Sequence, residues 1–311
     1  MINKKTAIVF AINGKYAFCL YVSICSLFKN SPLLMKQADI VVYTNNVSDR
    51  DKKTLKTINN IKIIDYDFPL EMQKTEAVKS FSVASFARYE CFNMLNVYEQ
   101  IIYLDSDILV QKELLNIFDL IKDSGIGLIK EKTNVEAFSN KIELFSLKEK
   151  MFNSGFFVLS NKLNVNFAQI TNFCYQNTVK YIKDLYLPDQ AIINYVIQYF
   201  KITPTVLNNV YNTPASLSRR ILNNAVIIHS TGNRKFWNYY YFDEWYNYYK
   251  QWICNNGTPI TNVRKDSKIY RYILEKFGLD KFVFFQLCPD VIKKPIKAIR
   301  FFIKYCFKIK Y

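Results

Sequence analysis

The amino-acid sequence predicts an α/β protein built on a mixed, mostly parallel β-sheet with helices on both faces. Short apolar runs of strand length alternate with longer segments of helical periodicity, and the alternation begins near the N-terminus. Half of the residues are apolar, with 25 Phe and 23 Tyr, so the chain can bury a large core and is not a disordered protein. With 7 glycines in 311 residues, it is a poor candidate for phosphate binding by a glycine-rich loop.

The first part of the chain alternates regularly between the two kinds of element. Strands are expected at residues 7–11, 39–43, 61–65 and 101–104. Helices are expected between them at residues 16–29, 49–59 and 82–95. In sheets of this kind ligands lie beyond the carboxyl ends of the strands, so functional residues are expected where strands end.

The second part of the chain continues the pattern less regularly. Further strands are expected at residues 125–129, 156–159 and 225–228, and a helix at 189–199. An aromatic and polar stretch at 239–252 then leads into an Asn-Asn-Gly-Thr-Pro linker. We therefore divide the chain into a main domain, residues 1–240, and a C-terminal aromatic and basic helical segment, residues 241–311. No stretch reaches the roughly 20 uncharged apolar residues that span a bilayer.

The net charge of +16 is concentrated at the C-terminus, where residues 281–311 carry eight Lys or Arg and a single acid. Such a balance indicates a polyanionic partner, which includes nucleotide phosphates, nucleic acid and anionic lipid. From Pro295 onward, a helix would align Lys297, Arg300, Lys304 and Lys308 along one side, surrounded by apolar residues. This pattern favours a helix that lies in an anionic membrane surface, although a terminal helix packed on the main domain is the alternative.

The cysteines agree with a location inside the cell. Seven cysteines are scattered along the chain without Cys-x-x-Cys spacing, which indicates reduced thiols and neither a disulfide framework nor a zinc site. Together with the basic tail, they lead us to expect a cytoplasmic protein that is peripheral on the inner face of the membrane.

A pair of carboxylates follows one of the apolar predicted strands. Residues 101–104 are all apolar or aromatic, and Asp105 and Asp107 come directly after them, one residue apart. An extended chain would point both side chains to the same side. Two carboxylates suit Mg²⁺ or Mn²⁺ bridging a diphosphate, whereas the alternative for an isolated Asp-x-Asp is a solvated turn.

The chain has one histidine, and it lies where another predicted strand ends. His229 follows the apolar run 226–228, and Gly232 and Lys235 come shortly after it. A lone histidine is often a structural residue, but these neighbours could instead hold a metal and a diphosphate. An imidazole added to two carboxylates would favour Mn²⁺ over Mg²⁺, because nitrogen is the softer donor.

Four motifs together resemble the family 8 retaining glycosyltransferases. They are Leu104-Asp105-Ser106-Asp107, Phe152-Asn153-Ser154-Gly155-Phe156, Pro188-Asp189-Gln190 and His229-x-x-Gly232-x-x-Lys235. Each motif is weak alone, but their order and spacing match the family over residues 7–237. The resemblance implies a GT-A type, Rossmann-like catalytic domain.

The resemblance also implies a role for each matching residue. The metal ligands would be Asp105, Asp107 and His229, holding Mn²⁺ or, as a second choice, Mg²⁺. The donor would be bound by Asn13, Arg88, Asp105, Ser106, Asn153, Gly232 and Lys235. Asp189 and Gln190 would be the catalytic residues beside the anomeric carbon.

Three of these residues also have a structural interpretation. Arg88 could be a surface cation or part of an ion pair, and Asn153 could belong to an ordinary turn. Asp189 directly after Pro188 would be a good helix N-cap. Two positions depart from the family pattern: Asn13 stands where an acidic residue usually contacts uracil, and Phe236 replaces a proline.

The function implied is transfer of a hexose, galactose or glucose, from a UDP-sugar to a sugar acceptor, with retention of configuration. The acceptor would be an oligosaccharide or glycolipid of a cell-surface glycan such as lipooligosaccharide, and no nucleic acid partner is expected. Two alternatives from other classes are a nucleotidyltransferase-like phosphate-handling enzyme and a non-catalytic basic nucleic-acid-binding protein.

Overall fold

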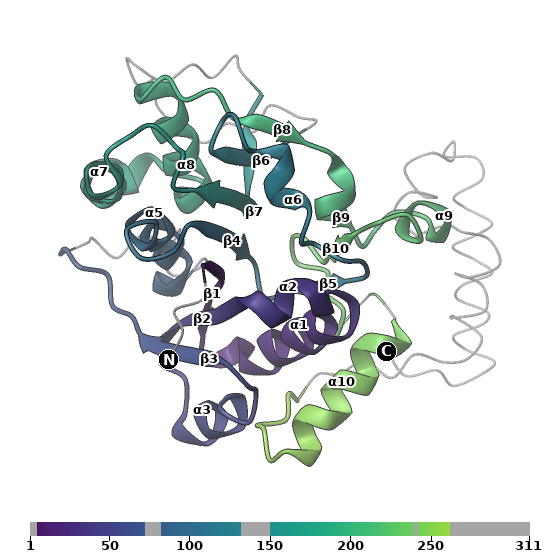
Figure 1. Ribbon diagram of the computed structural model, residues 1–311. Helices are drawn as coiled ribbons and strands as arrows, with labels where there is room; N and C mark the ends of the chain where they lie inside the picture. The colour runs from purple at the N-terminus through teal and green to yellow at the C-terminus, as the bar shows by residue number, and fades with distance from the viewer. Residues whose placement is uncertain (1–4, 72–81, 132–149, 239, 241, 262–311) are drawn as a thin grey trace, which may run out of the picture. The chain divides into compact units, whose positions relative to one another are not determined.

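The structure is a computed structural model that describes residues 5–71, 82–131, 150–238, 240 and 242–261 (Figure 1). The chain divides into two compact units. The first comprises Met1–Ala215 and Ala225–Val263, and the second comprises Ser216–Asn224 and Arg264–Tyr311. Among the described elements, the short helix α9 (Arg219–Leu222) belongs to the second unit. The fold described below is that of the first unit.

The described strands form two sheets. The larger sheet has seven strands in the order β3-β2-β1-β4-β7-β6-β8, and the smaller has three in the order β5-β10-β9. The strands of the large sheet are β1 (Thr6–Asn13), β2 (Ala38–Asn45), β3 (Ile61–Asp65), β4 (Gln100–Leu104), β6 (Ile126–Lys130), β7 (Phe152–Ser160) and β8 (Thr205–Leu207). Those of the small sheet are β5 (Ile108–Val110), β9 (Thr213–Pro214) and β10 (Ile227–His229).

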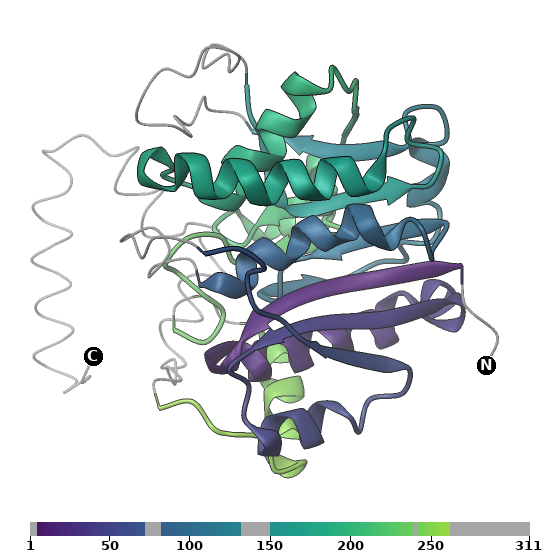
Figure 2. The ribbon, with the colours of Figure 1, turned by 90° about the vertical axis from the view of Figure 1, so that its left-hand side faces the viewer.

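Helices cover both faces of the large sheet, with α5, α7 and α8 on one side and α1, α2 and α6 on the other (Figures 1 and 2). The described α-helices of the first unit are α1 (Ala17–Asn30), α2 (Pro32–Gln37), α3 (Asp49–Leu55), α5 (Glu90–Met94), α6 (Ile117–Leu120), α7 (Phe167–Tyr181), α8 (Pro188–Tyr199) and α10 (Asp243–Cys254). The 3₁₀ helices are η1 (Gly14–Tyr16), η2 (Val83–Tyr89), η3 (Ile182–Asp184) and η4 (Asn209–Asn212). The predicted fold class is confirmed.

The direction of one strand is important for the site. The strands β3, β2, β1 and β4 are parallel, whereas β7 runs antiparallel to both β4 and β6. As a result the N-terminal end of β7 lies beside the carboxyl end of β4. Leu104 pairs with Phe156, and the Asp105 amide donates to the Gly155 carbonyl at 2.8 Å.

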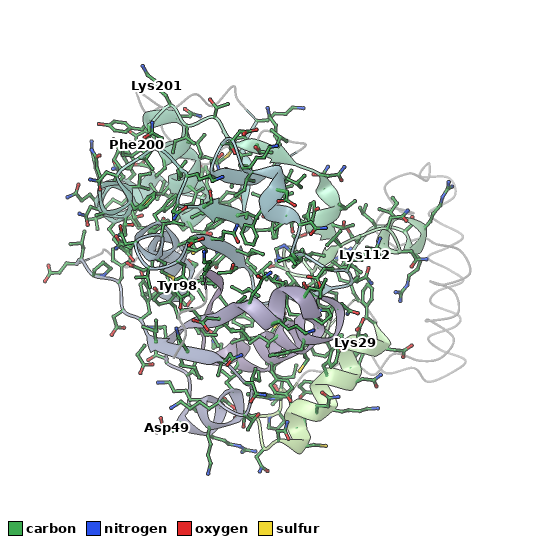
Figure 3. The ribbon with its side chains drawn as sticks, in the orientation of Figure 1. Lys29, Asp49, Tyr98, Lys112, Phe200 and Lys201 are labelled. Atoms are coloured by element: carbon green, nitrogen blue, oxygen red, sulfur yellow. The ribbon has the colours of Figure 1, made fainter. Side chains whose placement is uncertain are left out.

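The core follows from alternation along the strands. Val9 and Tyr103 belong to a buried hydrophobic cluster that also includes residues of α5, α7 and α8. The rings of Tyr103 and Phe157 stack there with centroids 4.9 Å apart. Charged side chains such as Lys201 and Asp49 project outward from the packed layers (Figure 3). This rigid framework holds the carboxyl edge of the sheet.

Several predicted elements differ from the structure, and the helix expected at 49–59 ends at Leu55 in α3. The helix expected at 82–95 is instead the 3₁₀ helix η2 followed by the single α-turn of α5. The strand expected at 225–228 is β10, which includes His229 as its last residue. The tighter winding of η2 has a local cause: Ser82, at φ 66°, accepts a hydrogen bond from the Ala84 amide, and the Arg88 side chain donates to the Ser85 carbonyl.

The segment after residue 240 contributes to the first unit. Helix α10 packs on α1, where Phe18 contacts Trp245 edge-on at 6.2 Å. Just beyond the helix, the Thr258 amide donates to Asp51 at 2.8 Å. In the part of the chain that the structure describes, no helix is long and apolar enough to cross a membrane. The predicted tail helix from Pro295 lies outside the described residues.

Candidate active site

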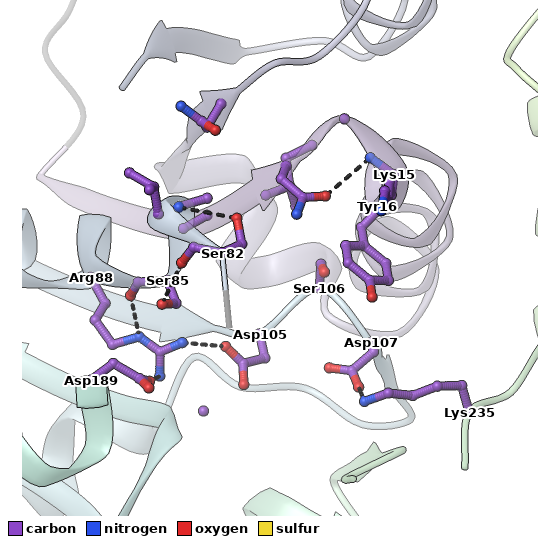
Figure 4. Close-up of a pocket in the computed structure, with 18 of the residues that line it drawn as sticks. Lys15, Tyr16, Ser82, Ser85, Arg88, Asp105, Ser106, Asp107, Asp189 and Lys235 are labelled. Atoms are coloured by element: carbon purple, nitrogen blue, oxygen red, sulfur yellow. Dashed lines mark hydrogen bonds and ion pairs between the residues drawn. The ribbon is translucent and has the colours of Figure 1, made fainter. Parts of the chain in front are cut away.

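A pocket of about 1130 Å³ opens at the edge where β1, β4 and β10 end and β7 begins (Figure 4). Every site residue predicted from the sequence lines it: Asn13, Arg88, Asp105, Ser106, Asp107, Asn153, Asp189, Gln190, His229, Gly232 and Lys235. Residues separated by more than two hundred positions are therefore brought to one cavity, as expected for the carboxyl edge of a mostly parallel sheet.

Asp105, Asp107 and His229, here called the metal triad, offer donor atoms that all lie within 4.8 Å of one another. His229 Nε2 is 3.0 Å from Asp107 Oδ1 and 3.8 Å from Asp105 Oδ2. The small sheet produces this convergence, because β5 begins directly after Asp107 and its first residue, Ile108, pairs with His229. The Ser230 amide also donates to the Asp107 carbonyl at 3.0 Å.

The triad fits a divalent cation in both chemistry and space. Two carboxylates and an imidazole form a donor set suited to Mn²⁺, with Mg²⁺ as a harder alternative. Gly155 leaves the space open: a Cβ there would lie 2.6 Å from Asp105 Oδ2 and 2.8 Å from His229 Cε1. The glycine of the Asn-Ser-Gly motif thus permits the strand to approach two of the three ligands.

Two cations, Lys235 and Arg88, balance the negative charges of Asp107 and Asp105. Lys235 forms an ion pair with Asp107 and donates to the Ser230 carbonyl at 2.8 Å. Burial raises the pKa of Asp107, but His229 and Lys235 outweigh it, so the pKa lies below its usual range. For His229, burial lowers the pKa, but the Asp107 carboxylate raises it by more, so the pKa lies above its usual value.

Arg88 lies at the centre of a second, buried network (Figure 4). Its guanidinium contacts Asp189 Oδ2 at 2.6 Å and Asp105 Oδ1 at 3.1 Å, and it donates to Ser154 Oγ at 2.7 Å. Burial lowers the pKa of Arg88, but the Asp189 carboxylate more than offsets this and keeps the group charged. The surface-cation interpretation of Arg88 is therefore wrong, and the arginine joins the metal triad to helix α8.

Asp189 and Gln190 lie in the first turn of α8, with their side chains turned into the pocket. Asp189 does not cap its own helix, since the N-cap is Leu187 and the Asp189 carboxylate accepts from Ser154 Oγ at 3.0 Å. Both residues are less than a tenth exposed. An acid held in this way keeps its carboxylate oxygens in fixed positions at the cavity wall, with its charge balanced by Arg88.

Asn153 lies in strand β7, so the expected alternative of an ordinary turn is wrong. Its Oδ1 accepts from the Gly155 amide at 2.8 Å and from Asn212 Nδ2 at 2.9 Å. Its Nδ2 donates to Glu131 at 2.7 Å. Asn212 and Glu131 were not anticipated, because neither lies in a recognisable motif.

The opposite end of the pocket is formed by the turn after β1. Asn13 Oδ1 accepts from the Lys15 amide at 3.1 Å, which leaves its Nδ2 toward the cavity. Tyr16 is 40% exposed, and its ring centroid lies 6.1 Å from that of Trp237. The sequence interpretation missed both aromatics, although each follows a predicted site residue closely enough to have been found.

The fold and the site define an α/β protein with a candidate divalent-cation site, Asp105, Asp107 and His229, at the carboxyl edge of its sheet. The family model for glycosyl transferase family 8 matches residues 7–240, and the chain belongs to this family. The protein is therefore a glycosyltransferase, and the two alternatives from other classes are set aside. No curated protein matches the sequence significantly.

Solved structures of glycosyltransferases share the GT-A type fold. WbbM, a bifunctional glycosyltransferase in its apo form, superposes with a TM-score of 0.61 at 16% identity, covering 82% of this chain and 52% of its own. The chain thus spans about half of WbbM. The galactosyltransferase LgtC, in complex with donor and acceptor sugar analogues, superposes with a TM-score of 0.55 at 18% identity, covering 85% of this chain and 99% of LgtC. GlyE of Streptococcus pneumoniae TIGR4 superposes with a TM-score of 0.53 at 18% identity, covering 85% of this chain and 66% of GlyE.

Proposed function

We propose that this glycosyltransferase moves a hexose, galactose or glucose, from a UDP-sugar to a sugar acceptor in a Mn²⁺-dependent reaction that retains the anomeric configuration. One observation carries the proposal: the metal triad shares a single pocket with the buried pair Arg88–Asp189 and with Gln190. A cation site and a fixed acid in one cavity match the two charges that develop when a sugar–phosphate bond breaks.

Asp105, Asp107 and His229 would hold the cation against the diphosphate. When bound, the cation supplies Lewis-acid stabilisation of the negative charge on the leaving nucleotide. Lys235 lies beside the triad and can turn its ammonium to a phosphate oxygen, while Gly232, at φ 71°, shapes the turn that precedes it. Ser106, between the two aspartates, lines the same wall.

The nucleoside would lie between the turn after β1 and the loop after β10. Tyr16 offers an exposed ring on which a uracil base can stack, and Asn13 Nδ2 can donate to a carbonyl oxygen of the base. The transferred sugar would then lie toward α8. There Asp189 and Gln190 would stabilise the positive charge of the ring, and Asn153 would bind sugar hydroxyls.

The acceptor is proposed to be an oligosaccharide or glycolipid of a cell-surface glycan such as lipooligosaccharide. The complex of LgtC with donor and acceptor sugar analogues supports a pocket that takes both substrates. Retention rests on the resemblance described above. The basic, aromatic residues beyond 281 support an anionic membrane surface at the inner face as the location of the acceptor.

Turnover with a panel of UDP-hexoses tests the proposal. We expect release of UDP with Mn²⁺ and an acceptor, loss of activity in EDTA, and loss in Asp105→Asn, Asp107→Asn and His229→Ala proteins that unfold at the wild-type temperature. Full turnover in EDTA would refute the metal dependence. The anomeric configuration of the product, read by NMR, decides between retention and inversion.

A binding experiment separates sugar contacts from nucleotide contacts. Gln190→Ala is expected to lower turnover strongly and to leave the affinity for UDP nearly intact in calorimetric titrations with Mn²⁺. A large loss of UDP affinity would mean that Gln190 builds the nucleotide pocket and does not act on the sugar.

A further inference from the structure

We propose that Asn212 is a positioning residue that fixes the tautomer of His229, so that Nε2 is the nitrogen offered to the cation. The proposal rests on the metal dependence proposed above. Asn212 is 8% exposed and lies outside the described wall of the pocket, so its role is not contact with substrate. Its Oδ1 is 2.7 Å from His229 Nδ1, and its Nδ2 donates to Asn153 Oδ1 at 2.9 Å.

The direction of these hydrogen bonds is set by two groups with fixed roles. The Gly155 amide can only donate, so the Asn153 atom that it meets at 2.8 Å must be the oxygen. At the other end of Asn153, the Glu131 carboxylate accepts at 2.7 Å, so that atom must be the nitrogen. Because the Asn153 oxygen accepts from Asn212, the Asn212 atom facing it is Nδ2.

The orientation of Asn212 then decides the protonation of the imidazole. With Nδ2 toward Asn153, Asn212 presents its oxygen to His229 Nδ1, which must therefore carry a proton. Without a cation Nε2 donates to Asp107 Oδ1 at 3.0 Å. When a cation displaces that proton, the ring that keeps its Nδ1 proton offers the lone pair of Nε2, the nitrogen that faces Asp105 and Asp107. Hydrogen bonds that orient a metal-binding histidine in this way strengthen both its geometry and its basicity as a ligand.

The backbone around Asn212 is held by the small sheet. Asn212 is the last residue of η4, and the next residues, Thr213 and Pro214, pair in parallel with Ile228 and His229. The strand that carries the ligand and the residue that orients it are thus neighbours in one sheet. The pairing therefore fixes the spacing of the backbone segments that carry Asn212 and His229.

Three substitutions test the proposal through Mn²⁺ binding, measured with UDP present by the EPR signal of free Mn²⁺. Asn212→Ala is expected to weaken Mn²⁺ binding by about 10- to 100-fold. Asn212→Asp keeps an oxygen for Nδ1–H, so its Mn²⁺ affinity is expected to stay near that of the wild type, while turnover falls because Asn153 loses its donor. The control is Asn209→Ala, an exposed asparagine of the same short helix, which is expected to match the wild type.

A second measurement needs neither the metal nor glycosyltransferase activity. His229 is the single histidine in the chain, so ¹⁵N-histidine labelling gives one imidazole spectrum without assignment. In the metal-free wild-type protein Nδ1 is expected to show the shift of a protonated nitrogen, because Asn212 Oδ1 accepts from it. Nε2 is also expected to carry a proton there, since the Asp107 carboxylate 3.0 Å away can only accept. In Asn212→Ala the Nδ1 shift is expected to move toward that of an unprotonated nitrogen, while Nε2 keeps the proton that it donates to Asp107.

The outcomes are distinct. Wild-type Mn²⁺ affinity in Asn212→Ala, or a wild-type imidazole without a proton on Nδ1, would overturn the role of Asn212. Equal loss of Mn²⁺ binding in Asn212→Asp and Asn212→Ala would also overturn it. A wild-type protein that binds no Mn²⁺ would instead refute the proposed metal dependence, whatever the spectrum shows.

Discussion

At the scale of single residues, the site depends on the missing side chain of Gly155 as well as on its polar groups. Gly155 has no side chain at the point where β7 passes between Asp105 and His229. The Asn-Ser-Gly motif therefore contributes an amide that accepts from Asn212, a hydroxyl for Arg88 and an open space within three consecutive residues. Its glycine is required by steric contact and not by an unusual backbone angle, since only Gly125 and Gly232 among the described glycines have positive φ.

Gly155→Ala tests this requirement. The added methyl group is expected to displace Asp105 or His229 and to abolish Mn²⁺ binding in titrations followed by EPR. Gly232→Ala is the contrasting control, because its Cβ would meet nothing within 4 Å, while its φ of 71° is unfavourable for alanine. That variant is expected to lose about 1–2 kcal/mol of stability and to keep its Mn²⁺ affinity. Normal Mn²⁺ binding in Gly155→Ala would contradict the steric argument.

Lys235 gives a second prediction at this scale. Its ammonium is paired with Asp107, so the proposed cation must compete with it until a diphosphate attracts the lysine away. Lys235→Ala is expected to bind Mn²⁺ more tightly than the wild type when no nucleotide is present. Its UDP affinity is expected to fall about tenfold to a hundredfold, as for the loss of one charged hydrogen bond.

Calorimetry of Mn²⁺ with and without UDP measures this coupling. In the wild type each ligand should strengthen binding of the other, and in Lys235→Ala the mutual effect should shrink. Unchanged coupling would mean that Lys235 does not move between Asp107 and the diphosphate.

At the scale of elements, one arginine ties together parts that are distant in sequence. Arg88 extends from η2 to the end of β4, the start of β7 and the first turn of α8. Its side chain is 6% exposed and that of Asp189 is 8% exposed. Removing one partner of such a pair leaves a buried charge without compensation.

Arg88→Ala is therefore expected to lower the free energy of unfolding by about 3–5 kcal/mol, measured in urea. Lys52→Ala is the control, because its partner Asp65 has a 74% exposed side chain, and exposed pairs contribute about 0–1 kcal/mol. If the two variants lost equal stability, the buried network would not hold η2 and α8 together.

The regular elements could be predicted from the sequence because their patterns are local. Strand β1 and helix α1 show their apolar periodicity directly in the sequence. Asp105 and Asp107 follow an unbroken apolar run. Other features depend on tertiary pairing. Nothing local distinguishes antiparallel β7 from a parallel strand, and Asn212 lies in a polar stretch that reads as a turn. Its contact with His229 exists because β9 pairs with β10.

At the scale of the whole molecule, the first unit is completed by residues after α10. Arg50 donates to the Asn256 carbonyl at 2.6 Å, and Thr258 both bonds to Asp51 and lines the pocket. A chain shortened before these residues would lose part of the active-site wall. Removal of the proposed membrane tail therefore has to begin after Thr261.

A chain that ends at Thr261 is expected to keep the wild-type unfolding temperature and Mn²⁺-dependent turnover of an acceptor in solution. It is expected to lose sedimentation with anionic vesicles at low salt, because each Lys or Arg near such a surface contributes about 1 kcal/mol. Unfolding of the shortened chain, or equal vesicle binding by both chains, would contradict a tail that serves membrane attachment.

The packing of α10 on α1 has a consequence for spectroscopy. All three tryptophans of the chain fall between residues 237 and 252. Trp245 and Trp252 are fully shielded from water, whereas Trp237 borders the pocket beside Tyr16. The tryptophan fluorescence of the protein therefore comes from one wall of the first unit, with two indoles as a constant background and one beside the proposed nucleotide pocket. Emission from Trp237 provides a built-in optical signal of donor occupancy, available without any dye or label.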